Sequence, residues 1–170
     1  MSFRNRCMIT GAQGIISLSV PLRDGRNQQL PVNEVLIADS EKWQERHFRS
    51  IESAYNRSPF FDHYRDELAA LYRKPFTHLS GWNLECMNWL KGKLEWPAEI
   101  RFTDAAVEFG RNGMDDRRDL VLPKNYNQFQ PVRYRQVFEE RTGFFSNLSI
   151  LDLLFNTGKS ASDLLKKAAC

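Results

Sequence analysis

The alternation of apolar and polar residues at the start of the chain predicts a β-hairpin. Residues 7–10 and 15–22 are rich in apolar and β-branched side chains, and the short stretch GAQG separates them. Two such runs joined by a glycine-containing turn are typical of paired antiparallel strands. A third apolar stretch, residues 32–38, predicts another short strand.

After residue 40 the apolar residues recur every three or four positions, which predicts helices. Asp39 or Ser40 can cap the first of them. Ser58 can cap the second, with Pro59 at the first helical position, where its missing N–H has no effect. A third helix is expected over residues 79–94 by the same spacing.

The carboxyl-terminal part predicts two further helices. Ser149 followed three positions later by Asp152 resembles a capping box, with Asp in place of the usual Glu or Gln, and Gly158 suits the end of that helix. A last helix is expected over residues 160–168. Residues 133–140 could be extended or helical, because their pattern favours neither.

These elements together predict an α/β (α+β) fold. We expect a small mixed sheet, made of the N-terminal hairpin and later short strands, packed by about five helices. A chain of 170 residues can bury a sizeable core, and we expect one domain over residues 1–170. The content of 42% hydrophobic and 12% aromatic residues argues against disorder.

The charge pattern does not indicate binding to nucleic acid. The 24 basic residues are interspersed with 21 acidic ones, and no basic stripe with stacking aromatics is present. Anionic small molecules remain possible ligands. No stretch approaches the roughly 20 apolar residues that a membrane span requires, so we expect no membrane insertion and a cytoplasmic location.

The sequence carries no signature of a metal or cofactor site. Cys7, Cys86 and Cys170 are far apart and form no CxxC pair, so neither a disulfide framework nor a zinc site is expected. GxGxxG, P-loop, HExxH and GxSxG motifs are absent as well. We therefore expect no metal and no cofactor.

Two groups of residues in the first half of the chain are candidates for ligand binding or catalysis. His47 could be a general base beside Arg49, which could hold an anion, or it could be a core-edge histidine bonded to the backbone. Arg4, Asn5 and Arg6 could clamp a phosphate or carboxylate, or could form an exposed terminal segment.

Two polar residues next to the predicted helices have similar alternatives. Ser58 could bind an anion at a helix start or act only as an N-cap. Asn83 interrupts an apolar helix face, so we expect it to pair with another element or to line a pocket.

Four blocks of the sequence resemble the WbqC-like protein family, which is found among bacterial genes for O-antigen and surface-polysaccharide synthesis. The blocks are FRNRCMI, WQERHFRSIESAYNRSPFFDHYRDEL, LVLPK and YRQVFEERTGFFSNLSILDLLFNTG. Family members usually begin with a strand-helix-strand segment upstream of RNR, so the resemblance implies an N-terminally shortened chain. A sheet edge exposed in this way would favour oligomerisation.

The resemblance implies a transferase of surface-polysaccharide (O-antigen, lipopolysaccharide) synthesis, with glycine transfer to a sugar as one possible reaction. A sugar nucleotide or an amino-acid donor would be the substrate. A non-catalytic binding or scaffold protein of the same pathway is the alternative. An enzyme should bring His47, Arg49 and Asp152 into one cleft, whereas a scaffold should present an apolar surface.

The resemblance also implies a site around the predicted helix that starts near Ser149. Asp152 and Asn156 lie on one face of that helix, and this face is expected to meet Tyr134 and Gln136. A pocket between them would make Asp152 a catalytic residue, and the other three residues would bind the substrate.

Overall fold

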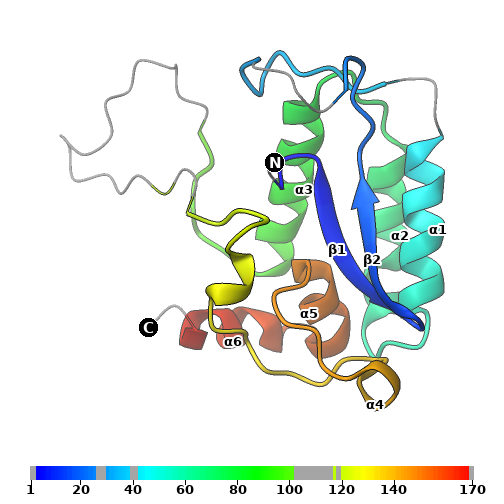
Figure 1. Cartoon of the computed structure of the whole chain (residues 1–170), viewed down its shortest axis with the longest axis vertical. Helices are drawn as coiled ribbons and strands as arrows, with labels where there is room; N and C mark the ends of the chain where they lie inside the picture. The colour runs from blue at the N-terminus through cyan, green and yellow to red at the C-terminus, as the bar shows by residue number, and fades with distance from the viewer. Residues whose placement is uncertain (1–2, 26–29, 39–41, 102–116, 118–119, 169–170) are drawn as a thin grey trace.

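A hairpin of two strands lies along three helices, and two shorter helices cover the end of this assembly (Figure 1). The computed structural model describes all residues except 1–2, 26–29, 39–41, 102–116, 118–119 and 169–170. Its elements are β1 (Arg6–Gly11), β2 (Gly14–Ser19), α1 (Trp43–Tyr55), α2 (Phe61–Arg73), α3 (Leu79–Lys93), the 3-10 turn η1 (Tyr126–Gln128), α4 (Glu139–Thr142), α5 (Ile150–Thr157) and α6 (Ser160–Ala168). The predicted α/β class is confirmed.

The hairpin forms where the alternating pattern predicts it. β1 and β2 pair antiparallel, and Gly11 faces Gly14 across a two-residue turn. Gly14 has φ of +119°, a conformation that only glycine adopts readily, which explains why glycine closes this turn. The hairpin is therefore a product of local sequence.

The expected third strand does not join this sheet, which has two strands among the described residues. Leu36 and Ile37 form isolated bridges instead, to His78 and Leu22. The N–H of Ile37 donates to the carbonyl of Thr77 at 2.8 Å, so this segment connects the end of the hairpin to the start of α3. Residues 120–123, an apolar stretch, contain bends and a turn and add no strand to the hairpin.

The first two helices lie close to their predicted positions, but α2 begins later than Ser58 predicts. Residues 58–60 form turns, and α2 starts at Phe61 without a side-chain cap. The N–H of Phe60 donates to the carbonyl of Phe155 in α5 at 3.0 Å, and this long-range bond holds the loop outside the helix. Asp39 and Ser40, the expected caps of α1, lie outside the described residues.

The core sits where α1, α2 and α5 meet. The Phe155 ring has edge contacts with Tyr55 and Phe61, at centroid distances of 5.0 and 5.1 Å, and all three residues are 0% exposed. α1 and α5 both contact β1, so the same core that joins the helices also holds the hairpin. α3, α5 and α6 have the extents that the sequence predicts to within one residue.

Gly158 should be hard to replace. Its φ is +59°, and a Cβ there would lie 2.7 Å from the Phe60 ring. We expect Gly158→Ala to lower the free energy of unfolding by about 2 kcal/mol or more, measured by urea titration. Gly92→Ala is the control, because Gly92 lies in helix α3 with open space around it, and there alanine should be neutral or stabilising. Equal losses in the two variants would contradict this account.

Candidate functional site

A cavity of about 190 Å³ opens between the hairpin and α3. It gathers residues that are far apart in the sequence. Its polar lining comes from the N-terminal stretch, α1, α3 and the start of α5, and includes Arg4, Asn5, Arg6, His47, Asn83 and Ser149. Apolar side chains such as Trp82 and Leu68 form the rest of its wall.

Two amide side chains hold the N-terminal stretch against this cavity. The Asn5 Nδ2 donates to the carbonyl of Val20 at 3.0 Å, and the Asn83 Nδ2 donates to the carbonyl of Arg4 at 3.0 Å. Asn83 therefore does both things expected of it, because it pairs with another element and lines the cavity. Since these bonds fix the backbone on both sides, Arg4 and Arg6 lie on the cavity wall and not on a loose end.

His47 is both a core-edge histidine and a cavity residue. It is 8% exposed, and its ring packs edge-on against Trp43 at a centroid distance of 5.2 Å. Its Nε2 lies 3.1 Å from the carbonyl of Ser19, to which it donates when neutral. Burial lowers the pKa of His47 to about 4. At neutral pH the ring is therefore uncharged, and Nδ1 is the nitrogen left to accept a proton.

Both described cysteines line the same cavity as protonated thiols. Burial raises the pKa of Cys7 to about 11 and that of Cys86 to about 12. A thiol attacks as its thiolate, so neither group is activated as a nucleophile. Cys170 lies outside the described residues.

Asp152 forms a second polar centre, behind the cavity and closed to solvent. The carboxylate is 0% exposed, and it accepts one hydrogen bond on each oxygen. The Tyr55 hydroxyl donates to Oδ1 and the Tyr134 hydroxyl donates to Oδ2, both at 2.6 Å. Burial raises the pKa of Asp152, and the two tyrosine bonds oppose this shift.

Gln136 extends this centre toward the loop before α5. Its amide exchanges two hydrogen bonds with the backbone of Phe145, at 2.8 and 2.9 Å, and its Nε2 also lies 3.4 Å from the Tyr134 hydroxyl. Asn156 donates to the carbonyl of Asp152 one turn back on the same helix, at 2.7 Å. Tyr134 and Gln136 thus lie beside Asp152, as hydrogen-bond partners within a closed network.

Of the two hydrogen bonds that define a capping box, only the one to the Ser149 hydroxyl forms. The Ser149 hydroxyl does cap α5, since it accepts from the N–H of Leu151 at 3.4 Å. The Asp152 carboxylate does not return to the N–H of Ser149, because that N–H donates to the carbonyl of Met8 in β1 at 2.7 Å. The hydroxyls of Tyr55 and Tyr134 donate to the Asp152 carboxylate instead.

The sequence model of the WbqC-like protein family matches residues 1–124. This chain belongs to the WbqC-like protein family. A protein of Mycobacterium tuberculosis described as "Uncharacterized protein Rv1507c" is 30% identical over 190 aligned residues, covering 96% of this chain and 81% of the relative. No solved structure matches the chain.

The matched region of this WbqC-like chain contains most of the cavity and, of the carboxylate centre, Tyr55 alone among the residues named above. His47, Asn83 and residues 4–6 lie within residues 1–124, whereas Tyr134, Gln136 and Asp152 lie beyond them. The alignment with the mycobacterial relative extends over nearly the whole chain. The cavity is thus the feature that the family match and the geometry share.

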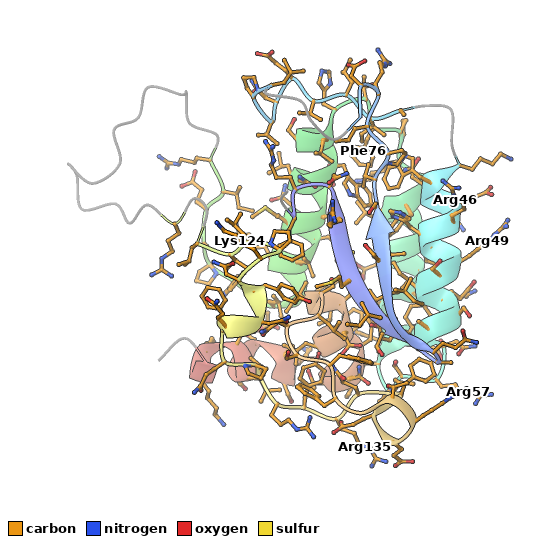
Figure 2. The ribbon with its side chains drawn as sticks, viewed as in Figure 1. Arg46, Arg49, Arg57, Phe76, Lys124 and Arg135 are labelled. Carbon is orange, nitrogen blue, oxygen red and sulfur yellow. The ribbon has the colours of Figure 1, made fainter. Side chains whose placement is uncertain are left out.

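The remaining predicted site residues lie elsewhere in this WbqC-like fold. The Arg49 side chain is 74% exposed on the outer face of α1, 3.4 Å from Glu45 (Figure 2). Ser58 is buried in the turn between α1 and α2. The structure therefore does not bring His47, Arg49 and Asp152 into one cleft.

The described part of the chain offers no obvious metal or membrane element. Over these residues, no group of three or more His, Cys, Asp and Glu side chains could hold a metal ion. Within the same ranges, every helix is too short or too polar to cross a bilayer.

Removal of the Asp152 carboxylate should destabilise the fold. We expect Asp152→Ala to lower the free energy of unfolding by about 3 kcal/mol or more, because it opens a void and leaves two buried hydroxyls without their acceptor. Asp152→Asn should lower the free energy of unfolding by less, since asparagine keeps the shape of the side chain and one acceptor oxygen. Urea unfolding followed by circular dichroism measures both. Asp66→Ala is the control, because the Asp66 side chain is 97% exposed, and a loss as large there would contradict this role.

The pH dependence of stability should carry the signature of His47. Its folded pKa of about 4 lies below the ordinary value of 6.5, so the unfolded chain binds more protons between these values. Stability is therefore expected to fall as pH drops from 6.5 toward 4, and His47→Gln should lack that part of the loss. NMR titration of the imidazole carbon shifts checks the pKa directly. A midpoint at or above 6.5 would show that the ring is not desolvated.

Proposed function

We propose that this chain is a transferase of bacterial surface-polysaccharide synthesis that binds an anionic, activated donor in the cavity between the hairpin and α3. One observation carries the proposal. Residues 4–6 and His47 are about 40 positions apart, yet they line one cavity together with Asn83. This set combines positive charge, hydrogen-bond donors and a proton acceptor, which group transfer from an activated donor needs.

Each side chain has a role in the proposed reaction. Arg4 and Arg6 hold the phosphate or carboxylate of the donor, because a guanidinium matches the geometry of such anions. His47 takes a proton from the acceptor hydroxyl through Nδ1 as the oxygen bonds to the donor carbon. The bond from that carbon to the leaving group breaks, and the leaving group departs with its negative charge beside the arginines. A sugar nucleotide or an activated amino acid such as glycine fits this chemistry.

The low pKa of His47 is compatible with this role once the donor is bound. An anion held by Arg4 and Arg6 favours the protonated form of a nearby imidazole, so binding itself strengthens the base. In this proposal Asp152, Tyr134, Gln136 and Asn156 do not touch the substrate. They hold α5 and its loop in place.

A non-catalytic binding protein of the same pathway is the second candidate, and two observations favour it. His47, Arg49 and Asp152 do not share one cleft, which is the arrangement expected of an enzyme. The cavity lining is the second observation. Among the described residues that line the cavity, none is a carboxylate. His47 is then the one neutral base among these described residues, and no carboxylic acid accompanies it, whereas many group-transfer sites use an acid and a base. A protein that only carries the donor would need the same arginines and no base.

A thermal-shift screen of sugar nucleotides and activated amino acids tests the proposal. We expect at least one donor to raise the melting temperature, because a ligand that binds only the native state stabilises it. Replacing Arg4 and Arg6 together with alanine should abolish the shift. Arg49→Ala should keep it, since Arg49 lies outside the cavity.

His47→Gln separates the two candidate functions. For a transferase, this variant should keep the thermal shift and lose product formation, measured by mass spectrometry of donor and acceptor mixtures. Binding by the unchanged chain without any product would support the carrier function. A thermal shift that survives the loss of both arginines would contradict the assignment of the cavity.

A further inference from the structure

A second hollow, of about 500 Å³, adjoins the proposed donor cavity. The two share part of their walls, so they lie on either side of the N-terminal stretch. The shared residues are Phe3, Arg6, Cys7 and Ser149. A ligand that occupied both hollows would contact this shared border, which includes the Arg6 guanidinium.

The walls of the second hollow are mostly aromatic and aliphatic. The rings of Phe3 and Tyr126 meet edge to face, with centroids 5.5 Å apart and planes at 85°. Phe129 and Val121 also line it, and they are 37% and 51% exposed. Exposed aromatic side chains offer flat surfaces on which another ring can stack.

The aromatic wall is held in place by a residue in an uncommon conformation. Asn147 has φ of +55°, which few residues other than glycine adopt. Its Nδ2 donates to the carbonyls of Tyr126 at 2.9 Å and Phe129 at 3.0 Å. Strain of this kind persists where the surrounding structure fixes it, so the wall is arranged before a ligand arrives.

We propose that the second hollow binds the base of a nucleoside diphosphate, whose two phosphates lie at Arg6 on the border of the cavity. This deepens the proposed function, on which it rests, by naming the class of donor. The base stacks on the aromatic wall, the phosphates meet positive charge, and the group to be transferred enters the cavity beside His47. An aromatic wall next to a guanidinium complements the two ends of such a molecule.

Calorimetric titration with UDP and with inorganic pyrophosphate tests the assignment. We expect UDP to bind roughly tenfold more tightly than pyrophosphate, the gain that stacking of one base typically gives. Phe129→Ala should remove most of this gain and leave the affinity for pyrophosphate unchanged. Phe129→Tyr should keep it, because the ring remains. Trp96→Ala is the matched control, since Trp96 is an aromatic residue 49% exposed outside both linings.

The outcomes separate this inference from the proposed function. If pyrophosphate binds and UDP binds no more tightly, or if Phe129→Ala weakens both ligands equally, the base site is wrong and the anion site stands. If neither ligand binds, the nucleotide inference is overturned, whereas the proposed function is decided by the thermal-shift screen of sugar nucleotides and activated amino acids. Circular dichroism of each variant shows whether its fold is intact. Should Phe129→Ala not fold, Val121→Ala must reduce the ratio of the two affinities for the base site to stand.

Discussion

The closed hydrogen bonds of Asp152 hold together parts of the chain that local sequence cannot join. One carboxylate on α5 receives a hydroxyl from the end of α1 and another from the extended segment before α4. Burying a carboxylate without hydrogen-bond partners costs much free energy. The loss of one tyrosine hydroxyl should therefore destabilise the whole network. The Tyr55 hydroxyl also accepts from the N–H of Thr10 in β1 at 3.2 Å, which extends the same network to the hairpin.

The network determines where the cavity forms. β1 is attached on its outer edge at two points, through Thr10 to Tyr55 and through Met8 to the N–H of Ser149. These bonds fix the strand relative to α1 and α5, and the stretch that carries Arg4 and Arg6 continues directly from it. The positions of Arg4 and Arg6 thus depend on Asp152 although it is not among the residues that line the cavity with them. In the proposed function Asp152 therefore acts by holding these elements in place and does not contact the donor.

The sequence predicts the features that depend on neighbouring residues, and it does not predict those that depend on residues far apart in the chain. The hairpin and the later helices depend on neighbouring residues, and their positions were predicted closely. Ser58 was assigned as a cap from local preference, but the bond between Phe60 and Phe155 overrides it. Tyr55 was missed as a polar residue because a tyrosine on an apolar helix face resembles core, and its partner is 97 positions away. No local pattern could have revealed that pair.

The Asp152 centre and the cavity carry opposite charges, so a direct contact between them would neutralise the positive charge of the cavity wall. The Asp152 carboxylate is closed off by tyrosines, so it does not neutralise the positive charge of the cavity wall. Because His47 is uncharged at neutral pH, that wall owes its charge to Arg4 and Arg6 alone among the described cavity residues. An anion that enters favours protonation of His47. In the proposed function, ligand binding and proton uptake are then coupled in this cavity, and a carboxylate placed beside His47 would weaken that coupling by supplying the negative charge in advance.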